Sequence, residues 1–274
     1  MPSEPLTLAE AADHLGVHYM TAYRYVRTGL LPATKTGGSW LISPPDLATL
    51  KRGQVTPQPR AQGTKATQGR LLSRLLAGDE AGAWGLLEAA LASDTKPDEI
   101  LLDLIAPALR VVGARWESGE LSIADEHRAS AVASRLISRL GGRFGRRGVK
   151  LGTVVLASPA GEMHSAPVAI TANLLRWRGF DVVELGADTP ADALAEAVTS
   201  ASDVLALGLA CTTFGTDRMA GTAIARVRRV SPETVVLLGG GAISGSAQAQ
   251  HIGADLYTGH RADEVVRAVE GLLA

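Results

Sequence analysis

The chain has 274 residues, of which 46% are hydrophobic and 20% charged, and its formal net charge is −1. This composition suits a globular protein with more than one domain and excludes disorder as its main state. No uninterrupted apolar run of about 18 residues occurs and the N-terminus lacks the apolar core of a signal peptide, so we expect a cytoplasmic protein without a membrane span. The lone Cys211 excludes an internal disulfide, and we expect it to be a small buried residue.

Positive charge is concentrated near the N-terminus. Residues 16–69 contain seven Lys and Arg residues against the single acid Asp46, which leaves +6 on this region. Such an asymmetry favours a polyanionic partner for this part of the chain. Residues 6–16 are predicted as a helix that Thr7 caps and Gly16 ends, and residues 17–27 as a second helix.

A hairpin is predicted over residues 33–42, with Trp40 in its core. Together with the two helices it predicts a winged helix-turn-helix domain over residues 1–51. The segments AADHLGV and TAYRYVRTGLLPATKTGGSWLISPPDL resemble the DNA-binding modules of the excisionase and MerR families. The second helix would then lie in the major groove of an operator. The residues expected to contact DNA are His18, Tyr19, Thr21, Arg24, Arg27 and Lys35.

The next two segments differ in periodicity. Residues 52–69, RGQVTPQPRAQGTKATQG, lack an apolar pattern and are predicted as a flexible linker. Residues 70–148 carry apolar side chains at helical spacing, with breaks at residues 78–79, 93–97 and 117–119. This pattern predicts a four-helix bundle.

Residues 149–274 alternate short β-branched runs with helical stretches. The alternation predicts a flavodoxin-like, doubly wound sheet of five parallel strands, which is a Rossmann-like architecture. Ligands of such sheets bind at the carboxyl ends of the strands. The loops that follow the first, third and fourth strands are therefore the candidate binding loops.

The first of these loops, SPAGEMHSAPVAI, places a carboxylate and an imidazole two residues apart. Glu162 can hydrogen-bond one ring nitrogen of His164, which fixes the tautomer and leaves the other nitrogen for a metal. From the residues alone, an exposed loop histidine without a ligand remains the alternative.

This Glu-x-His, with GLACTT at residues 208–213 and LGGG at residues 238–241, resembles the loops of the cobalamin-binding domain. The resemblance implies that His164 is the lower axial ligand of cobalt and that glycines after the fourth strand leave room for the nucleotide tail. Pro167 stands where the family has Gly, and Ala210 where it has Ser, whose hydroxyl Thr212 or Thr213 could replace. The implied cofactor-binding residues of this domain are Glu162, His164, Ser165, Thr212, Thr213, Gly239, Gly240 and Gly241.

In the bundle, Trp116 is followed after nine residues by Glu126 and His127. This spacing resembles the Trp-x9-Glu-His motif of CarH-type regulators, MerR-family photoreceptors with the same order of DNA module, bundle and cobalamin domain. The resemblance implies that the three residues cover the upper face of adenosylcobalamin. The chain departs from the family at Glu117, where the family has the histidine that becomes the second cobalt ligand after illumination.

The resemblance implies a repressor and not an enzyme. Adenosylcobalamin would drive assembly of a homo-oligomer, a dimer or tetramer, that binds operator DNA, and photolysis would relax it. Two alternatives stay open. One is a regulator that senses cobalamin or another tetrapyrrole without light. The other is a corrinoid methyl-carrier protein, against which the N-terminal DNA module argues.

Overall fold

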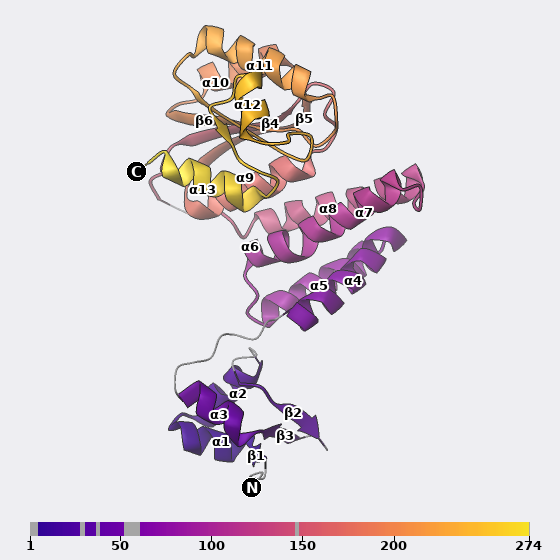
Figure 1. Cartoon of the computed structure of the whole chain (residues 1–274), viewed down its shortest axis with the longest axis vertical. Helices are drawn as coiled ribbons and strands as arrows, with labels where there is room; N and C mark the ends of the chain where they lie inside the picture. Colours follow the sequence, from indigo (N-terminus) through magenta and orange to yellow (C-terminus); the bar gives the residue numbers. More distant parts are fainter. Residues whose placement is uncertain (1–4, 28–30, 37–38, 52–60, 146–147, 274) are drawn as a thin grey trace. The chain divides into compact units, whose positions relative to one another are not determined.

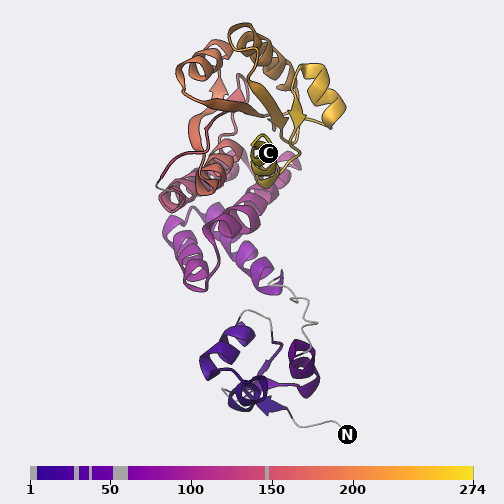
Figure 2. The same ribbon diagram turned by 90° about the vertical axis from the view of Figure 1, so that its left-hand side faces the viewer.

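The computed structural model describes residues 5–27, 31–36, 39–51, 61–145 and 148–273. The chain divides into two compact units, Met1–Thr67 and Gln68–Ala274, which Figures 1 and 2 show in two views. None of the described helices is both long enough and apolar enough to cross a membrane.

The described part of the N-terminal unit packs helices against a small antiparallel sheet of order β1-β3-β2. Thr7 caps the first helix with a reciprocal capping box with Glu10, and Gly16 ends this helix at a φ of 67°, as the sequence predicted. Residues from all three helices, together with Leu31 and Ile42, form its apolar core. The elements are β1 (Leu6–Thr7), α1 (Leu8–Leu15), α2 (Tyr19–Arg27), β2 (Thr34–Thr36), β3 (Ser39–Ile42) and α3 (Pro44–Lys51).

The second unit begins with antiparallel helical segments whose breaks lie at the predicted positions. The third segment is continuous from α6 to α7 through a π-helical turn at Leu101–Ile105. Pro107 explains this turn, because it has no N–H to donate to the carbonyl four residues earlier, that of Asp103. The helices are α4 (Ala61–Ala77), α5 (Glu80–Ala92), α6 (Pro97–Ile100), α7 (Ala106–Glu117) and α8 (Ile123–Gly141).

Helix α4 corrects the predicted linker at residues 52–69. Residues 61–69 are helical, and residues 52–60 lie outside the described residues. The side chain of Gln68 donates to the carbonyl of Asp103 at 2.5 Å, which supplies a donor that Pro107 cannot. Leu71 and Leu75 are fully buried in an apolar core that the helical segments share with one face of the sheet. Tertiary anchoring therefore extends the helix into a stretch whose composition indicates a tether.

The sheet of the second unit has five parallel strands in the order β5-β4-β6-β7-β8, which confirms the predicted flavodoxin-like topology. Helices α9 and α13 cover one face, and α10, α11 and α12 cover the other (Figure 1). The chain order reverses between β4 and β6, so their carboxyl ends define the edge where a ligand is expected. The elements are β4 (Thr153–Pro159), α9 (Ala166–Arg178), β5 (Asp181–Thr189), α10 (Ala191–Ser200), β6 (Val204–Ala210), α11 (Asp217–Val230), β7 (Val235–Gly239), α12 (Ser246–Ile252), β8 (Leu256–Tyr257) and α13 (Ala262–Gly271).

The helical segments share one apolar core with the α9 and α13 face of the sheet. Ile137 and Leu140 of α8 and Val168 and Leu175 of α9 all belong to this core. Phe144, just beyond α8, is fully buried and lies edge-on to the indole of a tryptophan in α9, with ring centroids 6.0 Å apart. This shared core fixes α8 beside the loop that carries the candidate metal ligand.

Cys211 is fully buried at the end of β6, as predicted, and burial raises the pKa of its thiol to about 11. We therefore expect it to be inert to a chromogenic disulfide reagent at neutral pH in the folded chain and to react fully after unfolding in guanidinium, because only the exposed thiolate attacks. Rapid reaction of the folded protein would contradict this burial.

Candidate functional site

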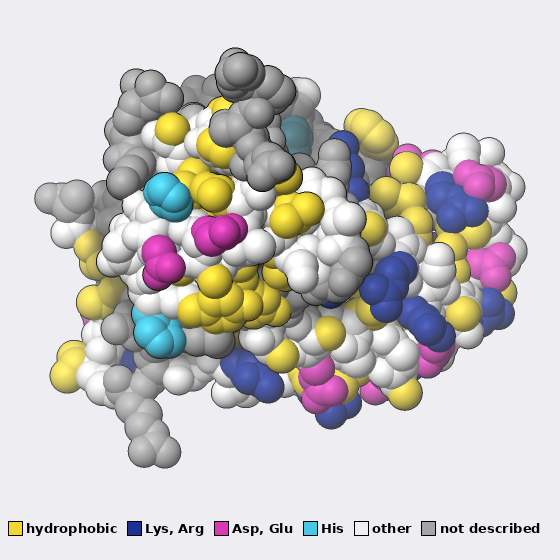
Figure 3. Space-filling model, turned by 90° about the horizontal axis from the view of Figure 1, so that it is seen from below, with side chains coloured by type: hydrophobic (Ala, Val, Ile, Leu, Met, Phe, Trp, Pro, Cys, Tyr) yellow, Lys and Arg dark blue, Asp and Glu magenta, His cyan; other side chains and the backbone are white. Residues whose placement is uncertain are grey.

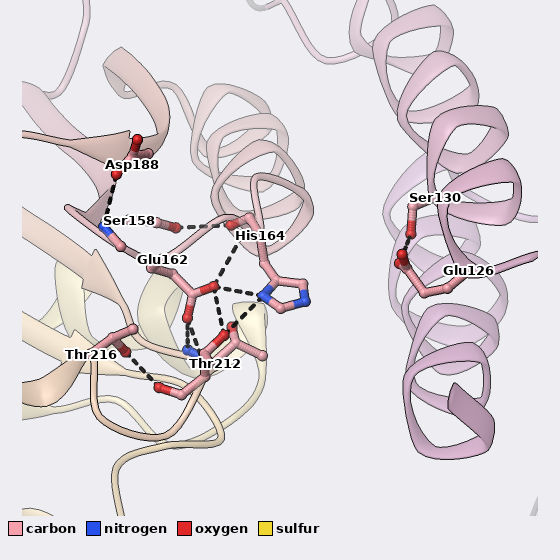
Figure 4. Close-up of polar contacts among 10 residues, drawn as sticks. Glu126, Ser130, Ser158, Glu162, His164, Asp188, Thr212 and Thr216 are labelled. Carbon is pink, nitrogen blue, oxygen red and sulfur yellow. Dashed lines mark hydrogen bonds and ion pairs between the residues drawn. The ribbon is translucent and has the colours of Figure 1, made fainter. Parts of the chain in front are cut away.

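The carboxylate of Glu162 is buried in the loop between β4 and α9 and accepts hydrogen bonds from two loops (Figure 4). Its Oε2 accepts the backbone N–H groups of Thr212 at 2.6 Å and Thr213 at 2.7 Å, both in the loop after β6. Its Oε1 accepts the backbone N–H of His164 at 3.0 Å and lies 2.6 Å from the ring Nδ1. One carboxylate therefore joins the loops that follow β4 and β6.

These hydrogen bonds keep Glu162 ionised. Burial raises the pKa of a carboxyl group, but the donors from His164, Thr213 and Thr212 outweigh burial and hold the pKa of Glu162 at about 2. An ionised carboxylate only accepts, so Nδ1 of His164 carries the proton of the shared hydrogen bond. A buried carboxylate without these donors would be strongly destabilising.

The imidazole of His164 presents its other nitrogen, Nε2, away from this network. The side chain is 49% exposed, and no residue in the described ranges hydrogen-bonds to Nε2. The hydrogen bond that His164 donates to Glu162 raises the pKa of His164 against the effect of burial, and the nearby carboxylates of Glu126 and Glu117 raise it further. In Figure 4 the ring points towards the side on which Glu126 and Ser130 lie. The predicted Glu162–His164 hydrogen bond is present, while the role of His164 as a cobalt ligand stays a prediction.

The predicted upper-face residues lie at the neighbouring ends of α7 and α8. Glu126 accepts from the Ser130 hydroxyl at 2.5 Å and pairs with Nδ1 of His127 at 2.6 Å. Burial raises the pKa of Glu126, but these hydrogen bonds and the nearby histidines lower it overall. Trp116 is 42% exposed near the end of α7. Within the described chain, none of the three predicted residues hydrogen-bonds to the loops of the sheet.

The two threonines contact Glu162, and the predicted contact of a threonine hydroxyl with a nucleotide tail stays a prediction. Both donate backbone N–H groups to Glu162, and the Thr213 hydroxyl donates to its Oε1 at 3.2 Å. The Thr213 carbonyl is held by the hydroxyl of Thr216 at 2.7 Å. The threonines therefore position the Glu162 carboxylate. Ser165 precedes α9 with an exposed side chain that makes no capping hydrogen bond.

Close packing of neighbouring loops explains why two of the residues after β7 are glycines. A Cβ on Gly239 would lie 2.5 Å from the Thr258 hydroxyl, and a Cβ on Gly240 would lie 2.1 Å from the Cys211 carbonyl oxygen. Gly240 also has a φ of +110°, which side chains disfavour. A Cβ on Gly241 meets only an ordinary contact at 3.7 Å. Gly239 and Gly240 let the loops after β6, β7 and β8 approach one another, and room for a nucleotide tail stays a prediction.

Pro167 and Ala210, the two residues of the sheet domain that depart from the cobalamin-binding motifs, line a narrow cavity between α9, α13 and the sheet. Its volume is about 30 Å³, which is about the share of one water molecule in the liquid. A nucleotide tail at this place therefore requires the walls of the cavity to move apart.

In the N-terminal unit, the predicted DNA-contacting residues lie on α2, just before it, or on β2. His18, Tyr19 and Lys35 are exposed, whereas Thr21 is half-buried. The side chains of Arg24 and Arg27 lie outside the described residues. Trp40 is half-buried against the core, as predicted, and Nζ of Lys35 lies 5.7 Å from the centre of its ring. Figure 3 shows one face of this unit, on which hydrophobic, acidic and histidine side chains are interspersed.

The side chains around His164 suit a cobalt ion that is already bound in a macrocycle better than they suit a bare metal ion. Among the described residues, no group of three or more His, Cys, Asp or Glu side chains could hold a bare metal ion. A single imidazole nitrogen with its partner nitrogen fixed by a carboxylate is a suitable axial ligand. The residues around His164 therefore fit a corrinoid.

Three family models match the chain. A helix-turn-helix domain matches residues 5–55, and two models described as B12 binding domains match residues 67–141 and 152–269. The chain therefore carries a helix-turn-helix region, which suggests DNA binding, together with B12-binding domains. This combination fits a cobalamin-binding regulator.

Corrinoid proteins are among the relatives. The dimethylamine corrinoid protein of Methanosarcina barkeri is 26% identical over 65% of this chain and 84% of its own length. Trimethylamine corrinoid protein 1 of Methanosarcina acetivorans is 27% identical over 71% of this chain and 91% of its own. The solved monomethylamine corrinoid protein of Methanosarcina barkeri has a TM-score of 0.65 at 17% identity, covering 76% of this chain and 99% of that one. The solved structure shows the shared fold, and the matches together support corrinoid binding.

Sequence reasoning missed several residues of this site. Ser130 lies four residues after Glu126, a helical spacing that brings side chains together and could have been recognised. The hydroxyl of Ser158 holds the His164 carbonyl at 2.9 Å. The carboxylate of Asp188, at the end of β5, accepts the backbone N–H of Gly161, and Asp188 has a positive φ, for which the sequence gives no direct signal.

Gly240 and Gly241 provide a matched pair of variants. Gly240→Ala should destabilise the fold by roughly 2 kcal/mol or more, because the new methyl group meets a backbone carbonyl at a disfavoured φ. Gly241→Ala should change the free energy of unfolding by less than about 0.5 kcal/mol. Urea unfolding of both variants checks this, and equal stabilities would contradict the packing role of Gly240.

Proposed function

We propose that this chain is a DNA-binding regulator that responds to a cobalamin held between the sheet domain and the helices α7 and α8. The observation that carries the proposal is the imidazole of His164, with Nδ1 held by a buried carboxylate and Nε2 left open, in a chain that also has a helix-turn-helix region. A regulator needs both parts, because one binds the signal and the other reads DNA.

The surroundings of His164 support a large, flat ligand. Met163 and Phe214, on the two loops that Glu162 joins, are 69% and 86% exposed. Trp116 adds an exposed aromatic ring from α7. Large exposed apolar side chains beside ordered polar groups are typical of a ligand surface. We propose that His164 binds the lower face of the corrin, and that Trp116, Glu126 and His127 cover the upper face.

The proposed ligand is adenosylcobalamin, whose cobalt–carbon bond supplies light sensitivity as a property of the cofactor. In this scheme the adenosyl group fills the space beside Trp116 and Glu126, and the chain then assembles into a homo-oligomer that binds operator DNA. The bound form must favour assembly by roughly 3 to 5 kcal/mol for an effective switch. Because Glu117 replaces the histidine of the CarH-type family, the chain lacks at this position the imidazole that could coordinate cobalt after illumination.

A second candidate is a corrinoid methyl carrier, which the named relatives favour. The helix-turn-helix match at residues 5–55 favours the regulator instead. The DNA contacts proposed for the regulator are those predicted on α2, just before it and on β2: His18, Tyr19, Thr21, Arg24, Arg27 and Lys35.

The test measures oligomer mass by light scattering and DNA affinity by gel shift, with DNA selected from a random oligonucleotide pool. The chain is compared without ligand, with adenosylcobalamin in the dark, and after green light. We expect assembly and DNA binding with adenosylcobalamin in the dark, and loss of both after light. His164→Ala should weaken adenosylcobalamin binding at least about tenfold, or 1.4 kcal/mol.

Ser200→Ala is the matched control, because this exposed serine at the end of α10 hydrogen-bonds through its hydroxyl to carbonyls of its own helix, and its loss should leave affinity unchanged. A ligand response without a light response would identify a light-independent regulator. Cobalamin binding that changes neither mass nor DNA affinity would favour the methyl carrier, and the absence of cobalamin binding would contradict the proposal.

A further inference from the structure

Asp188 stands out by its backbone conformation at the carboxyl end of β5. Among the described residues other than glycine, a positive φ occurs at Asp94, Asp188 and Asp203. The φ of Asp188 is 50°, a left-handed conformation that costs most side chains roughly 1 to 2 kcal/mol and that Asp tolerates better. Such strain at the edge of a binding site points to a positioning role when specific contacts depend on it.

Asp188 makes two hydrogen bonds to the backbone of the Glu162 loop. The Asp188 carboxylate accepts the backbone N–H of Gly161 at 2.8 Å, a contact drawn in Figure 4. The backbone N–H of Asp188 donates to the carbonyl of Glu162, also at 2.8 Å. Gly161 itself has a φ of +83°. The two hydrogen bonds therefore hold the backbone on both sides of the Glu162 Cα.

The left-handed turn makes this pairing possible. In an extended strand the backbone N–H of a residue lies in the plane of the sheet, whereas its side chain points out of that plane. The parallel register between β4 and β5 is already irregular between Ala157 and Pro159. The turn at Asp188 brings its N–H and its carboxylate to the same loop beyond the end of that register. Because Asp188 is exposed, burial of its side chain does not explain its conformation.

We infer that Asp188 is a positioning residue that sets the orientation of His164 by holding the Gly161–Glu162 backbone, an inference that rests on the proposed function of His164 as a cobalt ligand. Asp188 acts through Glu162 and touches neither the ring nor the space beyond it. If this backbone loosens, the Glu162 carboxylate no longer meets Nδ1 and the two amides of the β6 loop together. The imidazole then samples both tautomers and more than one ring orientation.

Three substitutions separate the two features of Asp188. Asp188→Asn keeps a side chain that tolerates the left-handed φ and keeps an oxygen acceptor. Asp188→Gly keeps the φ and removes the acceptor. Asp188→Ala removes the acceptor and strains the φ. Asp203→Gly is the matched control, because Asp203 has a φ of 54° but lies just before β6, at the opposite end of that strand.

The first measurement uses the ligand-free, ¹⁵N-labelled chain. The imidazole nitrogen shifts of His164 report which ring nitrogen carries the proton. In the wild-type chain and in Asp188→Asn we expect the Nδ1–H form of the neutral ring. In Asp188→Gly and Asp188→Ala we expect a substantial fraction of the Nε2–H form, and in Asp203→Gly the wild-type spectrum.

The second measurement is the dissociation constant for adenosylcobalamin, followed by absorbance in the dark. Loss of the Gly161 hydrogen bond should weaken binding about tenfold in Asp188→Gly, at the upper end of what one hydrogen bond contributes, while Asp188→Asn stays within about threefold of wild type. If wild type binds and Asp188→Gly matches it in both tautomer and affinity, the inference is overturned. If wild type does not bind, the proposed function fails, and the nitrogen shifts still decide whether Asp188 positions the ring.

Discussion

The buried carboxylate of Glu162 joins the two loops on which the candidate site is built. Its oxygens accept from the backbone of Thr212, Thr213 and His164 and from the ring of His164. A carboxylate this deeply buried is stable only with such donors. The same hydrogen bonds therefore close the two loops, keep Glu162 ionised and orient the imidazole of His164. No part of this arrangement can change alone, which gives the open nitrogen of His164 a fixed direction.

The helices opposite this nitrogen are not an independent lid, because α8 shares its apolar core with α9, the helix that begins two residues after His164. The same core extends through the helical segments to Leu71 and Leu75 of α4. A ligand that separates or clamps these elements would therefore act on a single packed core. On the proposed function, this continuity is the physical route from the corrinoid to the surfaces that assemble, since packed cores adopt alternative arrangements more readily than they deform continuously.

Much of this organisation could be predicted from the sequence. The period of the apolar residues gave the parallel sheet, and the rule for carboxyl edges led to Glu162 and His164. The helix at residues 61–69 could not be predicted, because its anchor is an Asp103 carbonyl that Pro107 leaves without a backbone donor, 35 residues away from Gln68. The contact of Thr212 was missed because it uses backbone amides, which are the same for every residue type except proline. The glycines after β7 were assigned to a ligand, whereas at Gly239 and Gly240 the close approach of neighbouring loops already excludes a Cβ.

The most direct test of the account is the electron paramagnetic resonance spectrum of the ¹⁵N-labelled chain with unlabelled cob(II)alamin. The axial nitrogen ligand of cobalt splits the high-field lines into doublets if it is ¹⁵N and into triplets if it is ¹⁴N. The account predicts doublets, because the ring of His164 displaces the base of the cofactor, and it predicts their loss in His164→Ala. Triplets in the wild-type chain, or doublets that persist without His164, would contradict it.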